Sequence, residues 1–445
     1  METQYDAIVI GGGPGGLATA YALNQSQSVL VVENDLWGGT CPNRGCDPKK
    51  MLYAAVEAQD RQKALRGFGV VGTSHINWPQ LMAFKNSYTE AIPAGTLNGL
   101  QKASIQTVYG TAHFIDANHL QVGQTTFTAK HFIVATGQAP IVPEIPGHQW
   151  LQTSNEFLAL PELPDQIALI GAGYVALELA NIAASAGAKV HIIQHNHRIL
   201  RAFPEQLTQQ LITSLSQKGV QFHFNTAVSQ VQQTADQLTL IDANQNWSLT
   251  VDAAFAALGR QPNLTDLALD QAGVQTTKHG ILVDDYLRTT NHQIFAIGDV
   301  VDRPQPKLTP VAGFEGRYVA SQLQTAHPTP ISYPLIPETV YASPQIAQVG
   351  LPVAIAQADP AKYTIKQQDV TKWYTFNRIK EPQATVITIF EQNTQQLVGV
   401  AVYSSLADQL INYFTQLIQQ QTTAAQLQQQ IFAYPSPASD LGYYF

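Results

Sequence analysis

Residues 7–16 read Ala-Ile-Val-Ile-Gly-Gly-Gly-Pro-Gly-Gly, a short apolar run followed at once by closely spaced glycines. This pattern predicts a strand, a glycine turn, a helix and a second strand, in that order. We place them at Ala7–Ile10, Gly11–Gly16, Leu17–Leu23 and Val29–Val32. Such a unit is the opening of a doubly wound α/β domain.

Three of these glycines have the spacing of a dinucleotide-binding turn: Gly11, Gly13 and Gly16. At Gly13 the backbone could approach a pyrophosphate closely, and the N-terminus of the following helix would favour its negative charge. Glu33 lies 20 residues beyond Gly13, at the end of the second predicted strand. A carboxylate there can accept a hydrogen bond from a ribose hydroxyl, so the unit predicts a bound dinucleotide.

The same order of elements returns more than 150 residues later. Its strand, turn, helix and second strand are placed at Ile167–Ile170, Gly171–Ala176, Leu177–Ala186 and Val190–Ile193. Two such units predict an α/β protein with two doubly wound, Rossmann-like domains.

The second unit differs from the first in the charge that follows its second strand. Its turn contains Gly171, Gly173 and Ala176. Its second predicted strand ends at Gln194, and no acidic residue follows. Basic side chains follow instead, at His195, His197, Arg198 and Arg201. A 2′-phosphate needs positive donors and is repelled by a carboxylate, so we favour NADPH here, with NADH still possible. The alternative is a basic loop that simply faces water.

The rest of the chain predicts a return to the first domain and then a third domain. Short apolar strands end in glycine turns at Phe132–Gly137, Phe255–Gly259 and Ile294–Gly298. From about Ser332, strands alternate with glutamine-rich helical stretches, which predicts an α+β domain. The expected segments are 1–140 and 260–331 for the first domain, 141–259 for the second and 332–445 for the third.

Composition excludes several classes of protein. The 445 residues are 45% hydrophobic and 13% charged, which indicates a globular chain. The net charge of -8 argues against nucleic acid as a partner, and no apolar run is long enough to predict a membrane span. Two cysteines cannot build a disulfide framework, so we expect a cytoplasmic protein.

Those two cysteines stand in the stretch Gly38-Gly-Thr-Cys-Pro-Asn-Arg-Gly-Cys-Asp-Pro-Lys-Lys50. Five positions apart in an ideal helix, the Cα atoms of Cys41 and Cys46 would be roughly 8–9 Å apart, and a disulfide needs about 4.4–6.8 Å. A bridge would therefore need an irregular first turn, for which Pro42 and Gly45 are suited. A helix start with basic neighbours would also lower both thiol pKa values. Zinc is not expected, because the spacing is wrong and no second ligand pair exists. Two ordinary buried cysteines remain the alternative.

With these motifs in order, the chain resembles the pyridine nucleotide–disulfide oxidoreductases, the family of glutathione reductase and lipoamide dehydrogenase. The resemblance covers the whole length and is strongest to the glutathione reductase branch. It is carried by Gly11–Gly16, Gly39–Lys49, Ala135–Gly137, Gly171–Glu178 and Ala296–Asp299. It implies a homodimer built through the domain that begins near Ser332.

The resemblance also implies the roles of individual residues. Cys41 would be the interchange thiol, Cys46 the charge-transfer thiolate beside the flavin, and Lys49 would pair with Glu178. FAD would be bound by Gly11, Gly13, Gly16, Glu33, Gly39, Thr40, Thr136, Gly137, Asp299 and Thr309. NADPH would be bound by Gly171, Gly173, Tyr174, Ala176, His195, Arg198, Arg201 and Arg260. The substrate would contact Arg317 and Tyr21.

The chain departs from the family near its C-terminus. Where glutathione reductases carry a catalytic His and its Glu, this sequence has Tyr434 and Ser439. Tyrosine is a poor base at neutral pH but can donate a hydrogen bond, so Tyr434 is the candidate orienting donor. We expect an NADPH-dependent FAD enzyme that reduces a low-molecular-weight disulfide through Cys41 and Cys46. The alternatives are reduction of a non-disulfide oxidant (a hypothiocyanous-acid-like species, a metal ion or a quinone), a lipoamide dehydrogenase, or a redox-inactive flavoprotein.

Overall fold

A computed structural model describes residues 3–445. The chain divides into two compact units. Of the described residues, the first comprises 3–51, 83–141 and 259–332, and the second comprises 52–82, 142–258 and 333–445. Both boundaries in the first hundred residues fall inside helices, α3 (Cys46–Ala64) and α4 (Trp78–Thr89). The four sequence segments named above remain a prediction.

The first unit is built on a mixed sheet with the strand order β3-β2-β1-β6-β5-β4 and with β18 beside β6. Its strands are β1 (Thr3–Ile10), β2 (Val29–Glu33), β3 (Gln106–Tyr109), β4 (Ala112–Phe114), β5 (His119–Val122), β6 (Thr125–Val134) and β18 (Ile294–Ala296). The pairs β1–β2, β1–β6, β2–β3 and β6–β18 are parallel. Every residue of β2 is buried, as expected of a parallel strand covered on both faces.

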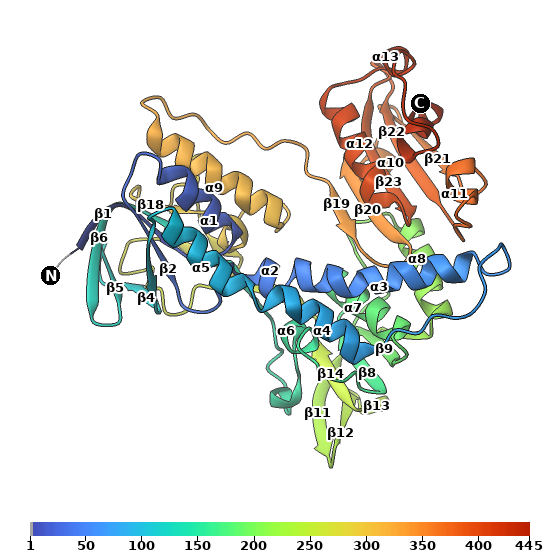
Figure 1. The fold of residues 1–445 in the computed structure, drawn as a ribbon, viewed down its shortest axis with the longest axis horizontal. Helices are drawn as coiled ribbons and strands as arrows, with labels where there is room; N and C mark the ends of the chain where they lie inside the picture. Colours follow the sequence, from blue (N-terminus) through green and yellow to red (C-terminus); the bar gives the residue numbers. More distant parts are fainter. Residues whose placement is uncertain (1–2) are drawn as a thin grey trace. The chain divides into compact units, whose positions relative to one another are not determined.

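Helices α1 (Pro14–Leu23) and α9 (Thr309–Gln324) lie side by side in this unit (Figure 1). A Cβ added at Gly316 would lie 2.5 Å from the carbonyl oxygen of Gly15, so the two helices approach each other at glycines. Ala20, Val319 and Ala320 join the buried cluster beneath them. This packing fixes the N-terminus of α9 relative to the first glycine turn.

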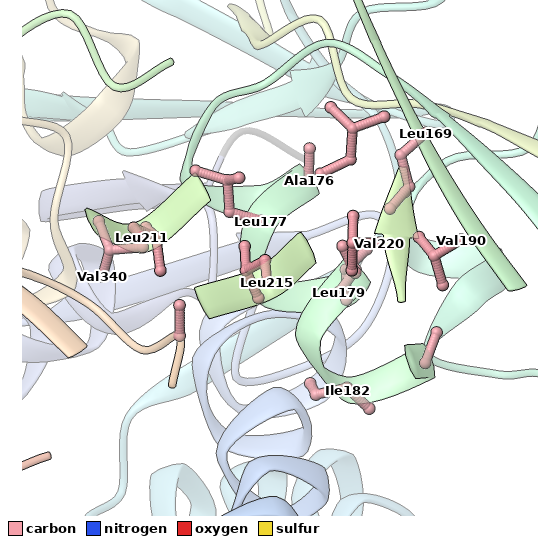
Figure 2. Packing of buried hydrophobic residues seen from close by; sticks show 14 of the residues in the cluster. Leu169, Ala176, Leu177, Leu179, Ile182, Val190, Leu211, Leu215, Val220 and Val340 are labelled. Carbon is pink, nitrogen blue, oxygen red and sulfur yellow. The ribbon is translucent and has the colours of Figure 1, made fainter. Parts of the chain in front are cut away.

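The second unit contains a parallel sheet with the order β10-β9-β8-β14 and an antiparallel sheet β11-β12-β13. The strands are β8 (Gln166–Ile170), β9 (Lys189–Gln194), β10 (Val220–Phe224), β11 (Val228–Thr234), β12 (Gln237–Asp242), β13 (Ser248–Val251) and β14 (Ala253–Ala256). Helices α7 (Tyr174–Ser185) and α8 (Glu205–Gln217) pack through an apolar core. Figure 2 shows Leu177 and Leu179 of α7 among Leu211 and Leu215 of α8.

The same unit ends in an antiparallel sheet with the order β19-β20-β23-β22-β21. Its strands are β19 (Glu338–Val340), β20 (Gln345–Gly350), β21 (Tyr363–Asp369), β22 (Thr385–Glu391) and β23 (Leu397–Ser404). Helix α12 (Ala407–Gln419) packs Leu410, Ile411 and Phe414 into the hydrophobic core of this sheet, and its glutamines are exposed to solvent. An amphipathic helix on a sheet is the α+β architecture expected for this part of the chain.

The remaining helices and strands complete the two units. They are α2 (Thr40–Arg44), α5 (Ile92–Lys102), α6 (Ser154–Phe157), α10 (Val353–Ala358), α11 (Tyr374–Asn377), α13 (Ala424–Leu427), β7 (Gln138–Pro140), β15 (Arg260–Pro262), β16 (Thr276–Thr277), β17 (Gly280–Ile281), and the 3-10 helices η1 (His148–Trp150), η2 (Gly298–Val300) and η3 (Pro437–Tyr444). Among residues 3–445, no helix is long and apolar enough to cross a membrane. The predicted fold class, two Rossmann-like domains and a C-terminal α+β domain, is confirmed.

Candidate active site

The first glycine turn connects β1 to α1 and is shaped by close backbone contacts. Gly11 has a φ of +114°, and a Cβ there would lie 2.4 Å from the carbonyl oxygen of Ala135. A Cβ on Gly16 would lie 2.0 Å from the carbonyl oxygen of Gly11. At Gly13 the nearest atom to an added Cβ is the Cα of Gly39, 3.6 Å away. Gly13 therefore borders a space that a side chain at this position would fill. A pyrophosphate needs this space to approach the backbone closely.

Glu33 ends β2 beside this turn and is buried. Its Oε2 accepts a hydrogen bond from the backbone N–H of Gly12 at 2.7 Å, and its Oε1 accepts from the N–H groups of Asn34 and Asp35. These bonds hold the carboxylate at the carboxyl end of the sheet. A carboxylate has about four acceptor positions, so it can still accept from a ribose hydroxyl. The turn and Glu33 therefore fit a dinucleotide.

Thr136, Gly137 and Asp299 lie at loops that follow strands β6 and β18 in the first unit. The Thr136 hydroxyl donates to the carbonyl oxygen of Asn263 at 2.8 Å, and Gly137 has a φ of +66°. Burial raises the pKa of Asp299, and the positive charges of Arg260 and Lys307 oppose this shift. A half-buried acid just beyond the end of a strand is suited to accept hydrogen bonds from a polyhydroxyl chain.

The two cysteines stand on either side of a break between helices. Helix α2 contains Cys41 and ends before Gly45, whose φ and ψ of -135° and -116° are not helical; α3 then begins at Cys46. A Cβ on Gly45 would lie 3.1 Å from the Cα of Cys41, so glycine lets the chain fold back on itself here. The irregular turn that a Cys41–Cys46 bridge needs is thus present. Both thiols are free in this structure.

The two thiols have opposite electrostatic surroundings. A hydrogen bond from Cys41 and the charges of Lys49 and Lys50 lower the pKa of Cys46 to about 6. The hydrogen bond with Cys46 and burial raise the pKa of Cys41. The expectation of two lowered thiol pKa values is therefore wrong for Cys41, because one negative charge shared by adjacent thiols settles on the one nearer the lysines. Arg44 contributes little here, since it forms an ion pair with Asp35.

Thr309 and Lys49 complete the surroundings of Cys46 within the first unit. The Thr309 Oγ1 lies 3.9 Å from the Cys46 Sγ, at the N-terminal end of α9. Lys49 is buried one turn into α3. A cation and a helix N-terminus both stabilise a thiolate, so this arrangement favours an ionised Cys46 beside a protonated Cys41.

Two residues near Cys41 were missed by the sequence analysis. Asp47 accepts a hydrogen bond from the Cys41 thiol, with 3.9 Å between Sγ and Oδ1. Its other oxygen accepts from the Tyr88 hydroxyl at 2.8 Å. Asp47 could have been noticed, because a carboxylate directly follows Cys46 in the sequence. Tyr88 gave no such signal, since it is 41 positions away and reaches Asp47 only through the packing of α4.

The second glycine turn lies in the second unit, between β8 and α7. Gly171 has a φ of +110°, and a Cβ there would lie 2.4 Å from the carbonyl oxygen of Ala257. Nothing lies within 4 Å of a Cβ added at Gly173, and Ala176 is fully buried against the sheet. Tyr174 begins α7 with its ring 46% exposed. The turn therefore also fits a dinucleotide pyrophosphate.

Glu178 follows one turn later on α7 and is only 2% exposed. Its Oε1 accepts a hydrogen bond from the backbone N–H of Tyr341 at 2.9 Å. A buried carboxylate in an apolar helix is costly, which points to a role beyond packing. Its predicted partner Lys49 belongs to the first unit, and the pairing stays a prediction.

The basic residues after β9 remain accessible. His195 and Arg201 are exposed, and Arg198 is half-buried, with a long contact of 4.0 Å to Glu205. Arg260, predicted to act with them, lies in the first unit, where its guanidinium donates to the carbonyl oxygen of Gln138. The second unit therefore brings together three of the four predicted basic residues.

The predicted substrate residues lie on different elements. Tyr21 of α1 is 41% exposed, and Arg317 of α9 is exposed. Tyr434 is 73% exposed in the second unit, and its ring stacks on that of Tyr374 with 6.0 Å between centroids. Among the described residues 3–445, no group of three His, Cys, Asp or Glu could hold a metal ion.

Comparison with known proteins agrees with this geometry. Residues 5–316 match the family described as pyridine nucleotide-disulphide oxidoreductase, and residues 336–442 match the dimerisation domain of that family. The chain is 29% identical to a glutathione reductase from Nostoc sp. over 99% of both chains. It is 33% identical to a dihydrolipoyl dehydrogenase from Geobacillus stearothermophilus, covering 79% of this chain and 76% of the relative.

Among solved structures, the chain is similar to the HOCl-induced flavoprotein disulfide reductase RclA from Escherichia coli. The TM-score is 0.90 over 99% of both chains, at 24% sequence identity. At that identity the likeness describes the fold.

Proposed function

The chain belongs to the pyridine nucleotide-disulphide oxidoreductase family, and from this premise we propose that it is an NADPH-dependent disulfide reductase. Electrons would pass from NADPH through FAD to the Cys41–Cys46 pair and then to a low-molecular-weight disulfide. The observation that carries the proposal is the pair of unlike thiols at the α2–α3 break, with the pKa lowered at Cys46 and raised at Cys41.

The first unit supplies the FAD site of this proposal. Its glycine turn would bind the pyrophosphate, Glu33 the adenosine ribose, and Asp299 the ribityl chain. Gly39, Thr40, Thr136, Gly137 and Thr309 would complete the site. When bound, FAD accepts a hydride from reduced nicotinamide and passes two electrons to a disulfide.

The cysteines would divide the remaining work between them. Cys46 would be held as a thiolate by Lys49 and the start of α3, which makes it the sulfur that stays with the cofactor. Cys41 would attack the substrate, the role that the family resemblance gives it, and because its raised pKa keeps it protonated at neutral pH, the attack requires a group that takes up its proton. Cys46 would then attack Cys41 and release the product.

The second unit supplies the NADPH site. The turn from Gly171 to Ala176 would bind the pyrophosphate, with Tyr174 covering the nicotinamide pocket. His195, Arg198 and Arg201 would face the 2′-phosphate, and the role of Arg260, which lies in the first unit, stays a separate prediction. Gln194, where an acid would repel that phosphate, supports NADPH over NADH.

We further propose a homodimer, in which a second copy contributes its C-terminal segment. The match of residues 336–442 to a dimerisation domain supports this assembly. Tyr434 would then act as a hydrogen-bond donor where glutathione reductases use a His. Two cysteines in 445 residues also suit the reducing cytoplasm, the compartment that we propose.

The substrate is proposed to be a disulfide with a good leaving group. Without the family His to protonate a departing thiolate, leaving groups of low pKa are favoured. The missing His and the lack of an acid at position 194 both make lipoamide a less favoured substrate. This holds even though a dihydrolipoyl dehydrogenase is 33% identical to this chain. A non-disulfide oxidant is the second candidate, since it would need no thiol leaving group.

A substrate panel tests this proposal. Anaerobic oxidation of NADPH would be followed with glutathione disulfide, coenzyme A disulfide, cystine, an aromatic disulfide, lipoamide and hypothiocyanous acid, with NADH in parallel. We expect the highest kcat/KM with the aromatic disulfide. Turnover with hypothiocyanous acid alone would mean that the substrate is a non-disulfide oxidant and not a disulfide. A flavoprotein that NADPH does not reduce would overturn the enzymatic proposal itself.

A further inference from the structure

A carboxylate lies against the interchange thiol and is fixed from its other side. Asp47 stands in the first turn of α3, and its Oδ1 accepts the Cys41 S–H across 3.9 Å. Its Oδ2 accepts the Tyr88 O–H at 2.8 Å, from the last turn of α4. The contacts form a chain from thiol to carboxylate to phenol, and all three residues belong to the first unit.

The charges around this chain are few and can be named. Cys41 is hydrogen-bonded to the Cys46 thiolate and lies beside the carboxylate of Asp47, and both raise its pKa, whereas the hydroxyl of Thr309 lowers it. The hydrogen bond to Asp47 raises the pKa of Tyr88. Lys49 and Lys50, in the first two turns of α3, act on Cys46, and Arg44 is paired with Asp35. Cys41 is therefore protonated at neutral pH and has one carboxylate within reach.

We propose that Asp47 accepts the Cys41 proton during attack on the substrate disulfide, with Tyr88 as the positioning residue that holds its carboxylate. This inference rests on the disulfide reductase function proposed above. It assigns within a single chain the proton acceptor that the His of glutathione reductases supplies and that Tyr434 cannot supply at neutral pH.

The step balances as a thiol–disulfide exchange. The Cys41 sulfur forms a bond to one substrate sulfur while the substrate S–S bond breaks, and the Cys41 proton moves to Asp47. The departing thiolate takes that proton and leaves as a thiol. The Cys46 thiolate then attacks the Cys41 sulfur, which re-forms the Cys41–Cys46 disulfide and releases a second thiolate that is protonated by water. The substrate gains two electrons, and the cysteine pair loses two.

Carboxylates are weak bases, but the proton is transferred while the new S–S bond forms, when the thiol is most acidic. As the Cys41 sulfur bonds to a second sulfur, its remaining S–H becomes strongly acidic, and a carboxylate is then basic enough. A competing explanation is that Asp47 only stabilises the N-terminus of α3, as acids in a first turn do. That role predicts a loss of thermal stability and no change in the pH profile.

The test compares Asp47→Asn and Tyr88→Phe with the matched variants Asp116→Asn and Tyr109→Phe. Asp116 and Tyr109 are exposed residues of the same unit, away from the cysteines in the hairpin β4–β5 and on β3. For each purified flavoprotein, kcat/KM for an aromatic disulfide is measured from pH 5 to 10, and reduction of bound flavin by NADPH is measured separately. Cys41 alkylation in the NADPH-reduced protein is followed against pH by mass spectrometry.

At pH 7 we expect Asp47→Asn to lower kcat/KM by about 10²-fold, the usual contribution of a general base. The loss should shrink as pH rises and Cys41 ionises by itself. The midpoint of Cys41 alkylation should move to lower pH, because a negative neighbour has been removed. Tyr88→Phe should lower kcat/KM by about threefold to tenfold, and NADPH should reduce the flavin at the normal rate in all four variants.

An Asp47→Asn enzyme with a wild-type pH profile would overturn the inference, whatever its melting temperature. So would an equal loss in Asp116→Asn. If the wild-type enzyme reduces no disulfide at all, the proposed function fails instead, and the inference falls with it.

Discussion

The turns at Gly11–Gly16 and Gly171–Ala176 have the same backbone conformation, but the strands that follow them end in different charges. Their second glycines, Gly13 and Gly173, have φ of -83° and -81° with ψ near 180°. Beyond the first turn, strand β2 ends in the buried carboxylate of Glu33. Beyond the second, β9 ends in the amide of Gln194, and exposed basic residues follow. The same fold therefore presents a carboxylate acceptor beyond one turn and cationic donors beyond the other.

We expect the backbone of each turn to determine that a dinucleotide binds, and the residues at the end of the following strand to determine which dinucleotide it is. A turn of this geometry accepts any pyrophosphate, because the ligand contacts backbone N–H groups and a helix N-terminus. Discrimination between a ribose hydroxyl and a 2′-phosphate needs a charge at the strand end. Backbone and side-chain substitutions should accordingly have different effects.

The largest effect is expected from Gly11→Ala and Gly16→Ala in the first turn. Each Cβ would lie within 2.4 Å of a backbone oxygen, so the turn must distort. Distortion costs on the order of 1–3 kcal/mol, roughly a tenfold to hundredfold loss of affinity. Flavin content of the purified protein and its melting temperature should both fall.

Gly95→Ala is the matched control for these variants. Gly95 lies within α5 of the same unit, with nothing within 4 Å of an added Cβ, and alanine favours a helix by about 1 kcal/mol. It should keep full flavin content. A Gly16→Ala protein with normal flavin content would show that the first turn does not hold the cofactor.

A smaller effect is expected at the second strand end, with Arg201→Ser and Gln194→Glu. The first removes an exposed cation and the second adds a carboxylate, so both should raise the KM for NADPH by about tenfold. The KM for NADH should stay level or fall. Steady-state kinetics with both nucleotides measures the change.

Lys189→Ser is the control for Arg201→Ser. It removes one exposed cation at the opposite end of the same strand, β9. It should leave the ratio of the two KM values unchanged. An equal shift in both variants would mean that overall charge, rather than the strand end, sets the nucleotide preference.

The smallest effect is expected from Gly173→Ala. Its φ suits alanine and no atom lies within 4 Å, so the melting temperature should not change. The added methyl group would lie where a pyrophosphate approaches, and should weaken NADPH binding about threefold to tenfold. Isothermal titration with NADPH measures it. Unchanged affinity would mean that the pyrophosphate does not contact Gly173.

Local sequence patterns were sufficient to predict the fold. The strand, turn and helix around Gly11 and Gly171 were expected within a few residues, because glycine spacing and apolar runs act over short distances. The break at Gly45 followed from the geometry that a disulfide demands.

Contacts between distant segments could not be predicted in the same way. Tyr88 reaches Asp47 only because α4 packs near the start of α3, and the location of Arg260 in the first unit follows from the pairing of β15 with β7. The unequal thiol pKa values depend on which cysteine lies nearer the lysines, which spacing alone does not indicate.

Cys41 is the thiol through which we propose that electrons leave the protein. The most direct measurement is a Cys41→Ser variant examined under anaerobic conditions, with flavin reduction by NADPH and disulfide turnover recorded on the same sample. If electrons leave through Cys41, NADPH reduces the flavin of this variant at the wild-type rate and no disulfide is turned over. Full turnover in this variant would contradict this proposal.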